Sequence, residues 1–174
     1  MEYRQGLVIV NTGNGKGKST AAFGTAIRAL GNGFKVVVVQ FIKGHWKTGE
    51  RAAFGTFPLA EFHSMGEGFT WDTQDPVRDK QVAMKAWGFG REKILSGEID
   101  LAVLDEINYA IDFGYVPLDE VLKTLAERPT HVHVILTGRN AKPELIELAD
   151  LVTEMREVKH PYSTGVKAQR GIEW

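Results

Sequence analysis

The sequence contains no cysteine, and that absence excludes several kinds of chemistry. Without thiols the chain forms no disulfide framework, offers no cysteine ligands to a metal, and carries no thiol-based redox step.

The sequence also lacks a charge excess of either sign and any long apolar run. Its 21 basic and 22 acidic residues leave a formal net charge of −1, and no basic stretch stands out, so we expect no general affinity for nucleic acid. The longest apolar runs, at 7–10 and 36–39, are far too short to cross a bilayer. No positively charged segment precedes an apolar stretch of signal-peptide length. These absences predict a cytoplasmic protein that binds neither membrane nor nucleic acid.

What is present has the composition of an ordinary globular domain. The chain has 174 residues, of which 43% are apolar and 25% are charged, and no repeat or linker divides it. We therefore expect a single domain over residues 1–174.

Short apolar runs alternate with helical patterns along the whole chain. The runs predict six strands, at 7–10, 36–41, 60–65, 101–104, 132–136 and 151–155. Helices are predicted from Thr20, from the Asp75-Pro76 cap to about 96, after Pro117, and over 143–149. Such alternation predicts an α/β fold with a mostly parallel sheet and helices on both faces. Ligands of these folds bind at the carboxyl ends of the strands.

A glycine-rich loop follows the first predicted strand and opens the first helix. It reads Thr-Gly-Asn-Gly-Lys-Gly-Lys-Ser-Thr at 12–20, in the context that a Walker A phosphate loop requires. Glycines such as Gly13 let backbone N–H groups turn inward around a triphosphate, and the start of the helix adds its positive dipole end. Lys18 can reach the outer phosphates, and the Ser19 hydroxyl can bind Mg²⁺. Thr12 stands where the usual pattern has its first glycine. The alternative to a phosphate loop is a glycine-rich turn without function.

Two carboxylates end the fourth predicted strand. Asp105 and Glu106 directly follow the apolar run 101–104, which is the Walker B arrangement. A carboxylate at this edge faces the phosphate loop and can hold Mg²⁺ directly or through water. Adjacent residues point to opposite faces, so we expect only one of the two to be a direct ligand. The spacing leaves open which one, and an ordinary solvated strand end is the alternative.

Three weaker signals leave alternatives open. His131 and His133 share a strand face but have no apparent third ligand, so we expect a structural role. Arg139 follows the fifth strand and either meets an anion or pairs with a neighbouring acid. Arg28 on the first helix lies near the nucleotide or is merely solvated.

Two large aromatic residues, Phe69 and Trp71, stand in a glycine-flanked polar loop. Exposing such side chains is costly, so they are expected to cover something. Composition alone does not separate covering a ligand from packing on the protein's own core.

Several motifs, in order, closely resemble those of the P-loop ATP:corrinoid adenosyltransferases. They are residues 6–26 (Gly-Leu-Val-Ile-Val-Asn-Thr-Gly-Asn-Gly-Lys-Gly-Lys-Ser-Thr-Ala-Ala-Phe-Gly-Thr-Ala), 39–44 (Val-Gln-Phe-Ile-Lys-Gly), 68–71 (Gly-Phe-Thr-Trp), 104–106 (Leu-Asp-Glu), 137–139 (Thr-Gly-Arg), and the ending Gly-Val-Lys-Ala-Gln at 165–169 with Gly-Ile-Glu at 171–173. The matches span almost the whole chain, and the threonine at position 12 fits this family's variant loop.

The resemblance implies a RecA-like P-loop fold with six parallel strands, working as a homodimer. It implies attack of a cobalt(I) corrinoid on C5′ of ATP, which yields the adenosylcorrinoid and triphosphate, with ATP reversed in the loop. A separate reductase, such as a flavodoxin, would deliver the electron. Which corrinoid is the natural substrate is left open.

The resemblance also implies roles for individual residues. Lys18 and Glu106 would be catalytic, Ser19 and Glu106 would serve Mg²⁺ with Asp105 as the other candidate ligand, and Arg28 would contact the nucleotide. The triphosphate would be held by Asn14, Gly15, Lys16, Gly17, Lys18, Ser19 and Thr20. The corrinoid would be met by Phe69, Trp71 and Arg139.

Two rival functions share the same loop and acidic strand end. One is an ATPase or kinase that cleaves between the β- and γ-phosphates, and it would release ADP. The other is a non-catalytic nucleotide-binding module, which would bind Mg-ATP without turnover. A nucleic-acid motor is least favoured, because the chain is short and has no basic stripe.

Overall fold

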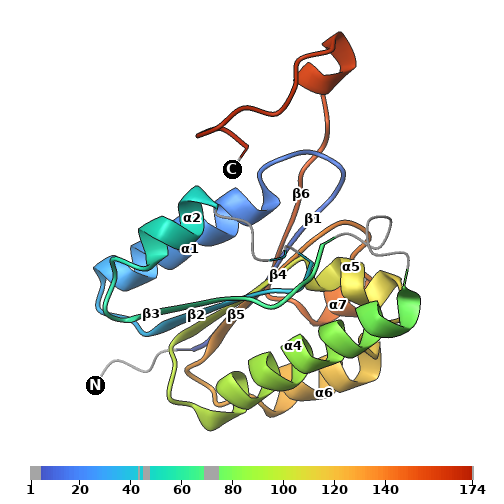
Figure 1. The fold of residues 1–174 in the computed structure, drawn as a ribbon. Coiled ribbons are helices and arrows are strands. Elements are labelled where there is room, and N and C mark those ends of the chain that lie inside the picture. Colours follow the sequence, from blue (N-terminus) through green and yellow to red (C-terminus); the bar gives the residue numbers. More distant parts are fainter. Residues whose placement is uncertain (1–4, 43, 45–47, 69–74, 174) are drawn as a thin grey trace.

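The computed structural model describes residues 5–42, 44, 48–68 and 75–173. Its centre is a six-stranded sheet with the order β3-β2-β4-β5-β1-β6, in which every neighbouring pair is parallel (Figure 1). The strands are β1 (Val8–Thr12), β2 (Val36–Gln40), β3 (Ala60–Ser64), β4 (Leu101–Asp105), β5 (His133–Thr137) and β6 (Leu151–Glu154). All six predicted strands are therefore confirmed, with ends shifted by at most a residue or two.

The helices are α1 (Lys18–Gly31), α2 (Gly49–Phe54), α4 (Pro76–Ser96), α5 (Ile107–Asp112), α6 (Leu118–Glu127) and α7 (Pro143–Leu148), with a 3₁₀ turn at Pro161–Thr164. The predicted start of α4 is confirmed, because the Asp75 side chain accepts a hydrogen bond from the Arg78 N–H at 3.1 Å and caps the helix. Sequence patterns missed α2 and α5, since a helix of six residues is too short to show a helical period.

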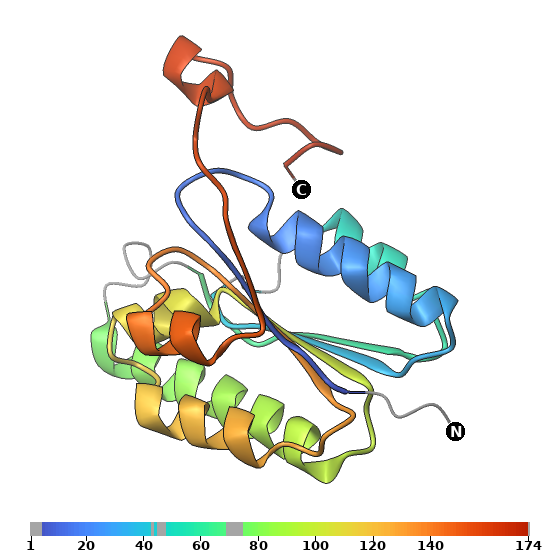
Figure 2. The same ribbon diagram turned by 180° about the vertical axis from the view of Figure 1, so that it is seen from behind.

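The helices cover both faces of the sheet, as the alternation predicts. One face packs on α1 and α2, and the other packs on α4, α5, α6 and α7 (Figures 1 and 2). The central strand β2 is buried throughout because Val37 and Val39 face one layer while Val36 and Val38 face the other. Gly90 in the middle of α4 allows close packing, since a Cβ there would lie 3.1 Å from the Leu104 side chain.

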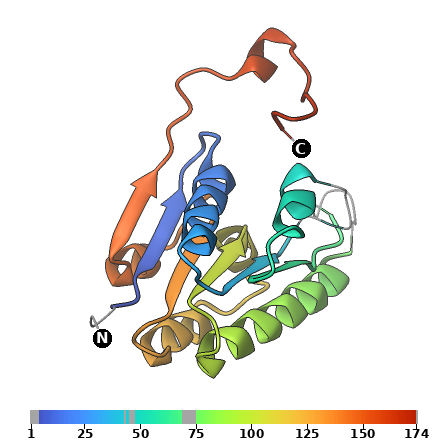
Figure 3. The ribbon, with the colours of Figure 1, turned by 90° about the vertical axis from the view of Figure 1, so that its left-hand side faces the viewer.

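The chain leaves this layered body after β6. The segment from 156 onward runs outward and turns back toward the phosphate loop (Figure 3), and nearly all of its residues are exposed. No helix in the described part of the chain has the length and apolar character needed to span a membrane.

Candidate active site

The site is built from loops that leave the carboxyl ends of three adjacent strands. The order β4-β5-β1 places the phosphate loop, the acidic pair at the end of β4 and the Thr-Gly-Arg segment at the end of β5 at one edge of the sheet (Figure 1). Because all these strands are parallel, their ends meet there although they are far apart in sequence.

The phosphate loop takes its shape from glycines and from a neighbour that sequence patterns missed. Gly13 and Gly17 have φ values of 93° and 108°, in the left-handed region that favours glycine. The Gly15 N–H donates to the Met155 carbonyl at 2.6 Å, so the chain after β6 lies directly against the loop. A Cβ on Gly13 would come 2.5 Å from that same carbonyl, which leaves no room for a side chain.

Lys18 is the buried cation of the site. Its side chain lies in the first turn of α1, the residue is 8% exposed, and Nζ donates to the Gly15 carbonyl at 2.7 Å. Burial lowers the pKa of Lys18; the charge of Glu106 opposes that shift, and the charge of Arg139 adds to it. The phosphate loop, the acidic strand end and the arginine after β5 therefore share one electrostatic environment.

Asp105 is fully buried and held from both sides by neighbouring strands. Gln40 Nε2 on β2 donates to Asp105 Oδ2 at 2.9 Å, and Thr137 Oγ1 on β5 donates to Asp105 Oδ1 at 2.9 Å. Ser64 Oγ on β3 extends the row by donating to Gln40 Oε1 at 2.9 Å. Both oxygens of Asp105 thus already accept hydrogen bonds inside the protein. No local sequence pattern signals this row.

Glu106 leaves the strand in an unusual backbone conformation. Its φ is 66°, which is uncommon for a residue with a side chain, and it stands immediately before α5. Its N–H donates to Thr137 Oγ1 at 2.9 Å. Its carboxylate reaches the neighbouring loop, because a Cβ on Gly138 would lie 3.1 Å from Glu106 Oε2. The acid that is partly open to solvent at this edge is therefore Glu106 and not Asp105.

These residues suit Mg²⁺ that arrives with a nucleotide. The described part of the chain contains no group of three or more His, Cys, Asp or Glu residues that could hold a metal by themselves. Mg²⁺ commonly takes one or two protein oxygens and completes its shell with waters and substrate phosphates. The Ser19 hydroxyl and the Glu106 carboxylate are oxygen donors of that kind, beside a loop shaped for phosphate.

The loop after β5 carries Arg139 in an exposed position. It is anchored through Asp112 of α5, which accepts hydrogen bonds from Asn140 at 2.8 Å and from Lys142 at 2.6 Å. Both bonds lower the pKa of Asp112, and the bond from Lys142 has the larger effect. Arg139 is thus presented to solvent by a fixed loop.

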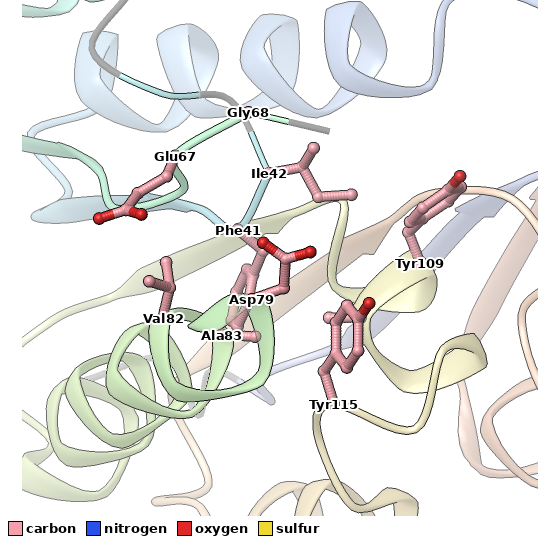
Figure 4. A pocket seen from close by; sticks show the side chains of 10 residues that line it. Phe41, Ile42, Glu67, Gly68, Asp79, Val82, Ala83, Tyr109 and Tyr115 are labelled. Carbon is pink, nitrogen blue, oxygen red and sulfur yellow. The ribbon is translucent and has the colours of Figure 1, made fainter. Parts of the chain in front are cut away.

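A small pocket at the same edge lies beside α5 (Figure 4). Tyr109 contributes to it, and burial is the main cause that raises the pKa of this phenol. Arg139 and Glu106 also act on Tyr109, so the pocket adjoins the phosphate site. The pocket is lined by Phe41, Ile42, Glu67, Gly68, Asp79, Val82, Ala83, Tyr109, Ala110 and Tyr115. Phe69 and Trp71 lie outside the described residues, directly after Gly68.

Arg28 lies away from this site. It is in the last turn of α1, ten residues after Lys18, which corresponds to about 15 Å along the helix axis. It lines a groove at the opposite edge of the sheet with Leu7, Phe34 and His133. Within one chain the structure therefore does not bring Arg28 to the phosphate loop.

The two histidines have structural partners, as expected. His133 Nδ1 accepts from the Leu7 N–H at 3.0 Å, and His131 Nε2 is 3.1 Å from the Gly97 carbonyl. A different residue joins the site from the end of the chain, because Glu173 forms an ion pair with Lys16 of the phosphate loop.

Known proteins of one family are similar to this chain over almost its whole length. The family model for ATP:corrinoid adenosyltransferase BtuR/CobO/CobP matches residues 4–174. A corrinoid adenosyltransferase of Pseudomonas aeruginosa is 52% identical, covering 98% of this chain and 84% of the relative. Corrinoid adenosyltransferase CobA of Salmonella typhimurium is 48% identical, with 98% and 86% covered.

Among solved structures, the RadB recombinase is similar with a TM-score of 0.51 at 15% identity. The match covers 91% of this chain and 78% of that one. At this identity the likeness concerns the fold alone, and it confirms the predicted RecA-like α/β architecture.

Proposed function

We propose, from the premise that this chain belongs to the ATP:corrinoid adenosyltransferase family, that Lys18 and Glu106 form the centre of its active site. The chain is an enzyme that transfers the adenosyl group of ATP to a corrinoid. The observation that carries the site proposal is geometric: the loop with Lys18, the strand end with Glu106 and the loop with Arg139 meet at one edge of the sheet.

The phosphate loop would bind the triphosphate of ATP. Its inward N–H groups and the start of α1 offer partial positive charge, and Lys18 adds a full charge. The residues proposed to contact the triphosphate are Gly13, Asn14, Gly15, Lys16, Gly17, Lys18, Ser19 and Thr20. Arg28 would need another route to the nucleotide, since it lies at the far end of α1.

Ser19 and Glu106 would hold Mg²⁺, with Asp105 as the buried anchor beneath them. Asp105 was the other candidate ligand, but its two oxygens already accept from Gln40 and Thr137. When bound, Mg²⁺ would neutralise negative charge that accumulates on the departing triphosphate.

The reaction needs little acid–base chemistry from the protein. Its nucleophile is the cobalt(I) of the corrinoid substrate, which would attack C5′ of ATP, and its leaving group is a whole triphosphate. Positive charge that is already in place stabilises such a leaving group without reorganisation. A buried lysine in a dipole-lined loop therefore suits this chemistry.

The corrinoid would bind beside the phosphate site. Arg139 is exposed on an anchored loop there, and Phe69 and Trp71 follow Gly68, which lines the adjoining pocket. We propose these three residues as the corrinoid contacts. The pocket between α4 and α5 would extend this surface through Tyr109.

The finer features of the molecule are proposals as well. Residues 1–174 would act as one domain in a cytoplasmic homodimer. A separate reductase such as a flavodoxin would supply the electron.

A product analysis tests the proposed reaction. The protein is incubated with ATP, Mg²⁺ and chemically reduced corrinoid while the corrin absorption spectrum is followed. Formation of the carbon–cobalt bond with release of triphosphate supports the proposal. Release of ADP and phosphate without a spectral change would support the ATPase or kinase alternative.

A further inference from the structure

We propose that Thr137, which ends a hydrogen-bonded row across four strands of the sheet, is a positioning residue for Glu106. The inference rests on the proposed role of Glu106 in holding Mg²⁺. The row is Ser64 on β3, Gln40 on β2, Asp105 on β4 and Thr137 on β5.

The donors and acceptors of this row set the direction of each bond. An ionised carboxylate only accepts hydrogen bonds, and a threonine hydroxyl has a single proton to donate. Because that proton goes to Asp105 Oδ1, the oxygen of Thr137 is left to accept, and it accepts the Glu106 N–H at 2.9 Å. Asp105 thus orients Thr137, and Thr137 in turn holds the backbone of Glu106.

The backbone of Glu106 needs a side chain to fix it, because Glu106 lies beyond the end of the strand pairing. The register of β4 with β5 runs up to Leu104 opposite Leu136, so Glu106 lies beyond the ladder. Its N–H donates to the Thr137 side chain, and its φ of 66° turns the chain out of the strand direction directly after that N–H. A left-handed conformation of this kind persists only where surrounding contacts over-determine it.

The same conformation aims the carboxylate of Glu106. Its Oε2 lies beside Gly138, the residue after Thr137. A Cβ placed on Gly138 would be only 3.1 Å from that oxygen. The carboxylate is also within electrostatic reach of Lys18. Thr137 therefore controls the backbone from which the acid reaches the phosphate site, although its own side chain is fully buried.

The first test measures the bond itself in the unmodified protein. The Glu106 amide should be among the slowly exchanging amides of the protein when hydrogen exchange is followed by NMR, because its N–H is bonded to a fully buried hydroxyl. Exchange as fast as in an exposed loop would overturn the inference without any variant.

The second test uses Thr137→Val, with Thr137→Ser as the conservative variant and Gln40→Met as the matched control. ATP affinity is measured by calorimetry with and without Mg²⁺. Thr137→Val should lose about tenfold or more of the affinity that Mg²⁺ adds, as is usual when a group behind a metal ligand is removed. Affinity without Mg²⁺ should stay unchanged, and Thr137→Ser should restore the Mg²⁺ response.

Gln40→Met removes a hydrogen bond from the same carboxylate but leaves the Glu106 N–H untouched. It should lower the melting temperature and keep the Mg²⁺ response. Equal losses of that response in Gln40→Met and Thr137→Val would overturn the inference, since they would make the row merely structural.

Glu106→Gln separates this inference from its premise. If Glu106→Gln loses the Mg²⁺ response and Thr137→Val keeps it, only the role of Thr137 is wrong. If Glu106→Gln keeps the response, the proposed metal role of Glu106 is wrong, whatever Thr137→Val does.

Discussion

At the scale of single residues, the site is a balance between one buried cation and the groups around it. Lys18 is buried among apolar and polar atoms, with Glu106 stabilising its charge and Arg139 opposing it. Burial of the ammonium is the largest of these influences. The free protein thus keeps a charge in an unfavourable place, where a triphosphate would compensate it.

Lys18→Met should weaken ATP binding strongly. Hydrogen bonds to charged groups contribute about 1.5–3 kcal/mol each, which corresponds to roughly 10- to 150-fold in affinity. Calorimetric titration with Mg-ATP measures the effect, and Lys85→Met on the exposed surface of α4 is the control. Wild-type affinity in Lys18→Met would contradict the assignment of the phosphate loop.

The same variant should stabilise the free protein near neutral pH. The pKa of Lys18 is lowered from its ordinary value of 10.5, so the unfolded chain binds the proton more tightly than the folded chain. Stability of the wild type therefore rises as the pH increases from the lowered pKa to that value. The advantage of Lys18→Met should shrink over this alkaline range, as thermal unfolding at several pH values would reveal. A gap that widens with pH would contradict the sign of the shift.

Asp105→Asn should be tolerated. The amide nitrogen of the new residue can donate to Gln40 if the Gln40 side chain flips, and Ser64 can rotate to accept in turn. Its carbonyl would still accept from Thr137, so Glu106 stays held. We expect a loss of about 1 kcal/mol, or about 2–4 °C in melting temperature, with the Mg²⁺ response of ATP binding retained. A lost Mg²⁺ response with unchanged stability would instead make Asp105 the metal ligand.

At the scale of elements, the phosphate loop depends on a segment that follows it by more than 130 residues. The backbone of Met155, just beyond β6, pairs with Thr12 and Gly15 on either side of Gly13. β6 itself is exposed along its whole length, so it contributes little to the core. Its contribution to the site is to bring Met155 against the loop.

Gly13→Ala should therefore damage the loop, while Gly24→Ala should not. A methyl group at position 13 would require a φ of 93° and would lie 2.5 Å from the Met155 carbonyl. A methyl group at position 24, within α1, meets no atom within 4 Å and raises helix propensity by about 0.8–1.0 kcal/mol. Calorimetry with Mg-ATP should show weaker binding for Gly13→Ala alone, and thermal unfolding should show a higher melting temperature for Gly24→Ala. Equal affinities would mean that the loop tolerates displacement of Met155.

At the scale of the whole molecule, the carboxyl ends and the amino ends of the parallel strands form two edges of the sheet, and these edges carry different groups. The carboxyl edge holds the phosphate loop, Glu106, Arg139 and the pocket beside Tyr109. The opposite edge holds the groove of Arg28 and His133. ATP and corrinoid are thus expected to meet at the carboxyl edge.

Trp71→Ala should spare ATP binding and impair turnover that starts from cobalt(II) corrinoid. Cobalt(II) keeps an axial ligand in water, and an aromatic wall under the ring would exclude water and ease reduction. A large aromatic side chain buries about 150–250 Å². Paired assays with corrinoid reduced to cobalt(I) beforehand and with cobalt(II) plus a mild reductant measure the difference. Equal losses in both assays with a lower melting temperature would indicate core packing.

The six strands, the long capped helix α4, the phosphate loop and the acidic strand end could be predicted from the sequence. These features are local, because a strand, a cap or a glycine turn is encoded within a few neighbouring residues. The assignment of Phe69, Trp71, Arg139 and the loop residues to ligands remains a prediction.

Which of the two acids is open to solvent at the site, and what holds it there, follows from contacts between strands that are distant in sequence. The bonds from Gln40 and Thr137 to Asp105 join residues 65 and 32 positions apart, and no local pattern signals such pairs. The same holds for Met155 against the phosphate loop and for Arg28 at the opposite edge. These relations arise from the order in which parallel strands lie side by side, and that order sets which distant residues become neighbours.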